Sequence, residues 1–154
     1  MTVVKRLLIL ACSQRKRPDQ SLLPAIERYN GPAFQIVRKF LRTHPVEAQS
    51  LKIYVLSAKF GLIPASQPTP IYNQRMTLNQ AQKLRPNALR KLERLLPNCN
   101  KLFINLGQIY WQALAGHEVI IPANISPVIA QGSSGRRQVE LRDWLYNGLP
   151  DGTS

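Results

Sequence analysis

The stretch Leu51-Lys-Ile-Tyr-Val-Leu-Ser-Ala-Lys-Phe-Gly-Leu62 indicates the fold class of this chain. Residues 51–56 are mostly apolar or β-branched and contain no turn residue, which predicts a strand buried on both faces. The chain then leaves the strand through Ser57 and Lys59 and turns at Gly61. A strand of this kind is typical of an α/β protein, in which ligands bind beyond the carboxyl ends of the strands.

The polar residues after this strand are therefore candidates for a functional site. We take Ser57 and Lys59 as candidate catalytic residues and Phe60 and Gly61 as candidate binding residues. The alternative is that the hydroxyl and the ammonium belong to an ordinary loop and that the glycine only closes a turn.

Further strands and helices alternate along the chain, which predicts a single α/β domain over residues 1–154. The other expected strands span residues 3–12, 102–107 and 118–122, giving a mainly parallel central sheet of about four strands. The expected helices span residues 32–43, 77–96 with a break or kink at Pro86, and 138–146, with a short helix after Gly107. Residues 19–31 and 63–73 are expected to be irregular, and residues 147–154 to be frayed.

The charge of the chain points to a polyanionic partner. The sequence has 21 Lys and Arg against 8 Asp and Glu, a formal net charge of +13. Nucleic acid is the first candidate. The alternative is a generally basic protein that binds nucleic acid only non-specifically. Aromatic residues are 7% of the chain, too few to indicate an extended stacking platform for single strands.

The sequence predicts no metal site, no cofactor and no membrane segment. Cys12 and Cys99 form no disulfide framework and no zinc-ligand spacing. The apolar run 3–12 is interrupted by Lys5 and Arg6 and has no cleavage-site pattern, and no apolar run is long enough to cross a bilayer. We therefore expect a cytoplasmic protein that is monomeric by default.

The exit from the first strand is strongly cationic. Cys12 ends the strand, and Ser13, Arg15 and Lys16 follow in a loop whose side chains and backbone N–H groups could hold a phosphate. The loop lacks the glycines of a Walker motif. The alternative is a solvated basic loop.

Polar residues also follow the other expected elements. A proline-stiffened loop ends in Tyr72, Asn73 and Arg75, which offer a ring, an amide and a cation to a base and its phosphate. The alternative for Tyr72 is that it packs the loop down. Asn105 lies near the end of the strand 102–107, and a buried Asn needs partners inside the protein or in a ligand.

Two further candidate segments contain glycine. Gly107 begins a turn into the short helix that contains Tyr110. Near the end of the chain a second Gly-rich basic loop, 131–137, leads into the last helix and is well placed for a phosphate. Its candidate binding residues are Ser134, Gly135, Arg136 and Arg137.

Several of these pieces together resemble a family of small bacterial and phage domains related to the YaaA-type peroxide-stress proteins. The matching pieces are Ala11-Cys-Ser-Gln-Arg-Lys16, Tyr29-Asn-Gly-Pro-Ala-Phe34, Leu56-Ser-Ala-Lys-Phe-Gly-Leu62, Tyr72, and Gly135-Arg-Arg137 before a Trp-containing helix. The Cys-Ser-x-x-Lys piece is also similar to a motif in accessory domains of archaeal tRNA-base-modifying enzymes. The resemblance implies a three-layer α/β/α fold like that of uracil-DNA glycosylases. Relatives often carry an acid where this chain has Asn73.

These observations favour a DNA N-glycosylase that flips a modified base out of the helix, with antiphage defence as a role implied by the resemblance. Asn73, Asn105 and Glu27 are candidates to orient water, and Ser13, Ser57 and Lys59 to stabilise the leaving base. Tyr29 is a further candidate binding residue. The alternatives are a non-catalytic nucleic-acid-binding module and a ribosyltransferase-like enzyme acting on a free nucleotide or nucleoside.

Overall fold

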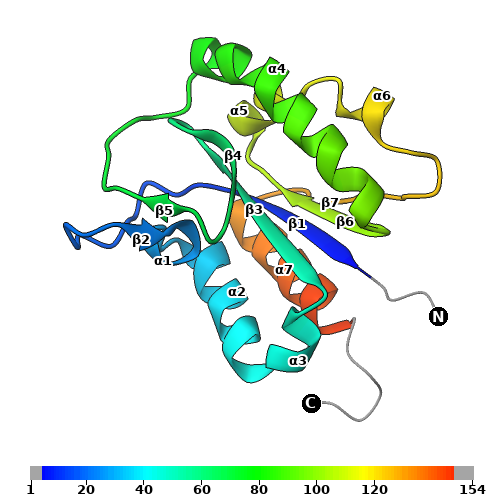
Figure 1. Ribbon diagram of the computed structural model, residues 1–154, viewed down its shortest axis with the longest axis horizontal. Helices are drawn as coiled ribbons and strands as arrows, with labels where there is room; N and C mark the ends of the chain where they lie inside the picture. The colour runs from blue at the N-terminus through cyan, green and yellow to red at the C-terminus, as the bar shows by residue number, and fades with distance from the viewer. Residues whose placement is uncertain (1–4, 148–154) are drawn as a thin grey trace.

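A five-stranded sheet forms the middle layer of the molecule (Figure 1). In the computed structural model, which describes residues 5–147, its strands lie in the order β4-β3-β1-β6-β7, and only β4 is antiparallel to its neighbour. They span β1 (Arg6–Ala11), β3 (Leu51–Ser57), β4 (Gly61–Pro64), β6 (Lys101–Asn105) and β7 (Val128–Ile129). Two short strands, β2 (Leu23–Pro24) and β5 (Pro68–Thr69), pair separately. The expected mainly parallel α/β sheet is confirmed, with five strands rather than about four.

Helices cover both faces of this sheet (Figure 1). On one face lie α2 (Pro32–Thr43), α3 (Pro45–Ala48) and α7 (Ser134–Asn147). On the other lie α4 (Leu78–Leu95), α5 (Gln108–Trp111) and α6 (His117–Ile120), with 3₁₀ turns at Leu96–Asn98 and Gln112–Leu114. The short α1 (Ala25–Arg28) lies beside β2 and β5. No helix among residues 5–147 is long and apolar enough to cross a membrane.

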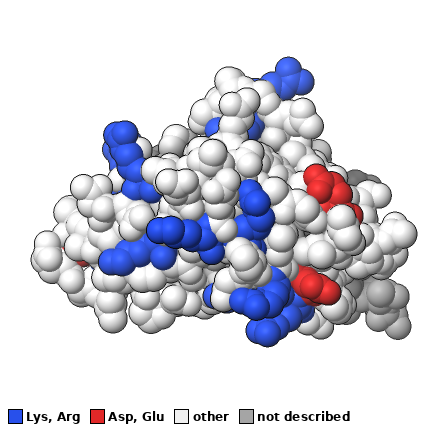
Figure 2. Space-filling view, turned by 90° about the horizontal axis from the view of Figure 1, so that it is seen from above, with Lys and Arg blue, Asp and Glu red and all other residues white. Residues whose placement is uncertain are grey.

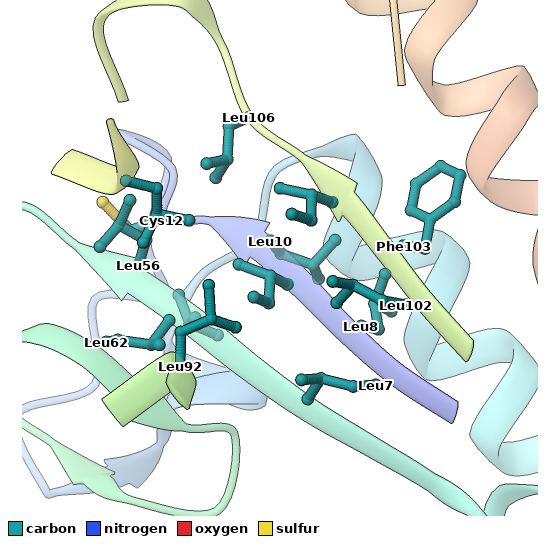
Figure 3. Close-up of a cluster of buried hydrophobic side chains, with 14 of the residues drawn as sticks. Leu7, Leu8, Leu10, Cys12, Leu56, Leu62, Leu92, Leu102, Phe103 and Leu106 are labelled. Atoms are coloured by element: carbon teal, nitrogen blue, oxygen red, sulfur yellow. The ribbon is translucent and has the colours of Figure 1, made fainter. Parts of the chain in front are cut away.

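The core is built on the central strand. Residues 7–10 of β1 are completely buried, because β1 has neighbours on both sides and helices on both faces. Figure 3 shows leucines of β1, β3, β4 and β6 meeting Leu92 of α4, with Cys12 at the end of this cluster. Burying side chains of this size stabilises the fold by about 1.5–3 kcal/mol each.

The second long helix runs without interruption through Pro86, so of the expected break or kink the break is wrong. The Thr77 side chain accepts a hydrogen bond from the Gln80 N–H and begins the helix, as the sequence predicts. Ala81, Ala88 and Leu92 pack inward, while Pro86 is exposed. The proline thus lies on the solvent side, where water can bond the carbonyl that it leaves free.

The prediction of a strand at residues 118–122 is also wrong, because residues 118–120 belong to the helix α6. The glycine before this helix, Gly116, has φ +94°, and Val119 is 88% exposed. A short apolar run does not distinguish a strand from a helix. The sheet instead contains two strands that were not expected. One is β7, which pairs with β6. The other is β4, which begins at Gly61, where a φ of +76° allows the chain to reverse tightly after β3.

Other segments also differ from expectation. The last helix begins at Ser134 rather than at residue 138, so 134–137 form its first turn and not a loop. Ser133 precedes it and accepts a hydrogen bond from the Arg136 N–H at 3.3 Å. The segments 19–31 and 63–73, expected to be irregular, contain β2, α1, the end of β4, and β5. Of the expected frayed end, Asn147 is the last residue of α7, and 148–154 lie outside the described residues.

Arg28 ties the loop after β1 to the segment around β5. Its side chain is fully buried. Nε donates to the carbonyl of Thr69 at 3.1 Å, Nη1 donates to Arg17 at 2.6 Å and to Asp19 at 2.8 Å, and Nη2 donates to Ser21. A buried charge is tolerated only when its hydrogen bonds are satisfied, and here backbone carbonyls satisfy it.

We expect Arg28→Met to lower the free energy of unfolding by about 3–5 kcal/mol, because it leaves several backbone carbonyls, including that of the buried Thr69, without a donor. The matched control is Arg17→Met. Arg17 is 43% exposed and pairs with Asp19 and Glu27 at 3.4 Å, so its loss should cost less than about 1 kcal/mol. Urea unfolding measures both, and equal losses would contradict the role given to Arg28.

Candidate functional site

The carboxyl ends of β1 and β6 lie at the point in the sheet where the order of strand addition reverses. From β1 the chain passes through α2 to β3 on one side, and later through α4 to β6 on the other. In open α/β sheets, connections that leave on opposite faces create a crevice at this point, where ligands bind. The sequence-predicted site residues lie mainly at this edge.

A pocket of about 220 Å³ occupies this crevice. Its walls come from the end of β1, the start of α2, the end of β6, α5 and the first turn of α7. The lining residues are Ala11, Cys12, Ser13, Gly31, Pro32, Ala33, Phe34, Asn105, Gly107, Tyr110, Ser134, Arg137 and Gln138. None of them is acidic, and the amino termini of two helices, α2 and α7, border the space. Both features favour an anionic or strongly polar ligand.

Asn105 is the most enclosed polar side chain in the pocket wall. It is 5% exposed at the end of β6, and its Nδ2 lies 3.5 Å from Oε1 of Gln138 on α7. The structure gives its Oδ1 no hydrogen-bond partner among residues 5–147. The carboxamide therefore has bonding capacity left for a ligand.

Three hydroxyl groups form a cluster beside this pocket. The hydroxyls of Tyr29 and Tyr72 are 2.5 Å apart, and that of Tyr72 lies 2.9 Å from Ser57 Oγ. Ser57 Oγ also accepts hydrogen bonds from the backbone N–H groups of Lys59 and Phe60. Ser57 and Tyr29 are completely buried, so they position Tyr72 and the turn after β3 rather than contact solvent themselves.

Two ammonium groups lie against the ring of Tyr72. Lys16 Nζ is 4.6 Å and Lys59 Nζ is 5.8 Å from the ring centroid, within the range of cation–π attraction. Phe60 packs edge-on against the same ring at 5.4 Å. The cationic exits of β1 and β3 thus meet at one half-buried aromatic ring.

Burial keeps the phenols of this region protonated even at strongly alkaline pH. It raises the pKa of Tyr29 to about 12, and it also raises the pKa of Tyr72 and of Tyr110, with the nearby Cys12 adding to both shifts. Tyr110 Oη is 3.3 Å from Cys12 Sγ. Burial also lowers the pKa of Lys16. At neutral pH the region therefore offers O–H groups that can donate hydrogen bonds, and cations.

The loop after β1 is fixed by backbone pairing. Lys16 forms a single antiparallel bridge with Tyr29, in which the Arg17 N–H donates to Arg28 and the Asn30 N–H donates to Arg15. Nearby, the Gly31 N–H donates to Ser13 Oγ at 3.2 Å. These bonds bring the cationic loop and the start of α2 to the same edge of the sheet.

The structure thus brings two groups of predicted residues together and leaves a third apart. The pocket group is Cys12, Ser13, Asn105, Gly107, Tyr110, Ser134 and Arg137. The cluster group is Lys16, Tyr29, Ser57, Lys59, Phe60 and Tyr72. Outside both lie Arg15, Glu27, Gly61, Asn73, Arg75, Gly135 and Arg136.

The predicted site residues outside both groups lie in other parts of the structure. Glu27 pairs with Arg17 on α1, Asn73 and Arg75 are exposed before α4, and Gly61 is buried at the β3–β4 corner, with a methyl group of Leu84 nearest to where its Cβ would lie. Arg136 is exposed and lies 3.7 Å from Glu140. Among residues 5–147 no three His, Cys, Asp or Glu side chains could hold a metal ion.

Sequence reasoning missed the wall made by the start of α2 and by Gln138. Gly31 and Pro32 signalled the start of a helix, but not that it begins against Ser13. It also missed the arginines that hold Tyr29 in place. Arg28 is one, and Arg38 is another, since its guanidinium donates to the carbonyls of Ile26 and Tyr29. No sequence pattern distinguishes an arginine whose side chain bonds backbone carbonyls from one that lies on the surface.

A family model covering residues 7–137 matches the sequence. The chain belongs to a family of unknown function, DUF6884. The matched range contains every pocket residue except Gln138, so this family's domain includes the site described above. No curated protein and no solved structure matches the chain.

We expect Gly31→Ala to destabilise the protein by about 1–3 kcal/mol, because the new Cβ would lie 2.9 Å from Ser13 Cβ. The φ of Gly31 is −74°, so space and not backbone conformation is limiting. In the control, Gly135→Ala, nothing lies within 4 Å of the new atom in α7, and stability should rise by up to about 1 kcal/mol. Thermal unfolding of both variants is the measurement; no loss in Gly31→Ala would refute the close packing.

The buried phenols predict alkaline instability. Because the folded-state pKa of Tyr29 is about 12, above its ordinary value of 10.0, its contribution is complete below pH 10 and is lost as the pH rises toward 12. That contribution is about 2–3 kcal/mol. Urea unfolding across this range should show the decline, and Tyr29→Phe should reduce it. Tyr146→Phe, outside the cluster, should leave the decline in place; a flat profile in the unmodified protein would contradict the assignment.

Proposed function

We propose that this protein is an N-glycosylase-type hydrolase that removes a nucleobase from DNA. The observation that carries the proposal is the small pocket at the ends of β1 and β6, with the buried Asn105 in its wall. Its volume of about 220 Å³ is below the 300–1,000 Å³ usual for drug-sized ligands and suits a single base displaced from a helix.

The basic surface supports a DNA substrate. Figure 2 shows Lys and Arg spread over the face that carries α4, with acids at one side. On α4 itself, Arg85 and Lys91 bond the carbonyls of Gln112 and Leu62, whereas Lys83, Arg90 and Arg94 are exposed. Together with the net charge of +13, these exposed cations would attract phosphates.

The chemistry assigns tasks to two residues of the pocket. The bond that breaks joins C1′ of deoxyribose to a base nitrogen; its electron pair leaves with the base. The oxygen of a water molecule then bonds to C1′, and the water's proton passes to the departing base or to solvent. Asn105 would hold the base edge or this water, and Tyr110 would donate to charge developing on the base.

The absence of an acid from the pocket wall constrains the mechanism. The sugar becomes positively charged in the transition state, and a carboxylate usually balances that charge. In this protein the phosphates of the bound strand would balance it, held by cations such as Lys16 and Lys59. The proposal therefore expects faster cleavage within a strand than in a free nucleoside.

The uracil-DNA-glycosylase-like architecture and the kinship with YaaA-type domains are parts of the same proposal. The mainly parallel sheet with helices on both faces and the location of the pocket support them. Removal of modified phage bases, and hence antiviral defence, would follow from such an activity.

A nucleic-acid-binding module without catalysis is the second candidate, and the acid-free pocket wall favours it. It predicts binding that weakens steeply with salt while every base stays attached.

An abasic-site assay tests these proposals. The protein is incubated with unmodified DNA and with DNAs carrying different modified bases, and alkali then cuts wherever a base is lost. We expect cleavage of one class of DNA, and a loss of about 10²–10³-fold in rate for Asn105→Ala. The control Asn98→Ala, exposed before the amino end of β6, should keep full activity.

Intact strands with salt-sensitive binding would favour the binding module instead. Base release from free nucleotides but not from DNA would favour the ribosyltransferase-like alternative. Full activity in a folded Asn105→Ala protein would remove Asn105 from the mechanism.

A further inference from the structure

Arg137 carries a guanidinium group that the rest of the described chain does not satisfy. Its Nε is enclosed by protein and makes no hydrogen bond, the one buried side-chain nitrogen or oxygen among residues 5–147 in that state. None of the ion pairs found among these residues includes Arg137. Buried donors in folded proteins nearly always have partners, so this guanidinium lacks hydrogen bonds inside the protein. Because Nε is enclosed, a ligand would bind the Nη nitrogens, which lie beside Gly107 in the pocket wall.

Its neighbour in the sequence behaves differently. Arg136 is 74% exposed and lies 3.7 Å from Glu140, four residues along the same helix. The two arginines carry the same charge and occupy the same turn of α7. Arg136 thus has an ordinary surface environment, while Arg137 is turned toward the interior without an acid to pair with.

Arg137 lies between two cavities. It lines the 220 Å³ pocket and also a neighbouring hollow of about 590 Å³, which Gly107, Trp111 and Gln131 help to form. A side chain on Gly107 would place its Cβ 3.7 Å from Nη1 of Arg137, so the glycine leaves that side of the guanidinium uncovered. The 5%-exposed Asn105 lies in the same pocket wall.

We propose that Arg137 binds a phosphate group of the nucleotide whose base occupies the pocket; this assignment rests on the proposed function. A guanidinium presents several N–H donors in a planar fork that matches phosphate oxygens. The amino-terminal ends of α2 and α7 add positive potential at the same place. With a base in the smaller cavity, the sugar–phosphate chain continues past Arg137 into the larger one.

This placement defines the substrate class. The ligand is a nucleotide unit with a phosphate next to its sugar, not a free base or a nucleoside. The phosphate at Arg137 also supplies a negative charge near the sugar that the pocket walls lack. Arg137 is therefore a binding residue whose loss weakens affinity for phosphate-bearing ligands most.

Nitrogen-15 NMR of the arginine Nε–H groups tests the assignment without any catalysis. The unmodified protein is titrated with inorganic phosphate and with 2-deoxyribose 5-phosphate, and with 2-deoxyribose and sodium chloride as controls. We expect saturable shifts of the Arg137 Nε–H resonance with the two phosphates and not with the controls.

Variants separate a specific site from general charge. Arg137→Gln should weaken binding of 2-deoxyribose 5-phosphate by at least about tenfold, whereas Arg136→Gln, with the same loss of charge, should change it by less than about twofold. Arg137→Lys should give an intermediate affinity, and Gly107→Ala should weaken binding by covering the guanidinium. Thermal unfolding verifies that each variant is folded.

Failure of this assignment can be told from failure of the proposed function. No Arg137 shift with either phosphate, or equal losses in the Arg136 and Arg137 variants, would overturn the phosphate site even if bases are released from DNA. Saturable phosphate binding at Arg137 with no base release would support the site and count against the glycosylase.

Discussion

The buried guanidinium of Arg28 is the interaction on which the candidate site depends. A positive charge with no exposure to water needs several hydrogen bonds, and Arg28 obtains them from backbone carbonyls of the loop after β1 and from Thr69. The loop is thereby held against α1, and Lys16 reaches the ring of Tyr72. A basic residue in the interior thus fixes the place of the basic residues at the surface of the site.

Hydroxyl groups and cations replace carboxylates in this site. Tyr29, Tyr72 and Tyr110 are uncharged at neutral pH, burial raises the pKa of each above its ordinary value, and no acid lines the pocket. A site of this composition stabilises negative charge on a ligand and leaves the balancing of positive charge to the ligand itself. The proposed nucleic-acid substrate, which brings its own phosphates, would meet that requirement better than a neutral molecule.

The sequence predicted helices and strands correctly where the signal was a long apolar pattern or came from adjacent residues. The strand 51–56, the helix after Gly31 and the Thr77 cap are all present, because burial and capping act over a few neighbouring residues. It failed for the run 118–122, which is too short for its periodicity to separate a strand from a helix. It also placed the start of the last helix too late, since Ser133 is the residue that caps it.

The sequence by itself determined the α/β class, the basic charge, and the chemical character of the residues at the strand ends. Only the tertiary structure decided which of them share a site: Asn105 and Arg137 line one pocket with Cys12, while Glu27, Asn73 and Arg75 lie elsewhere. The physical reason is the separation along the chain of the residues that interact. Strand and helix signals arise between neighbours in the chain, whereas the partners of a buried polar group come from segments far apart in sequence and are set by how the layers pack.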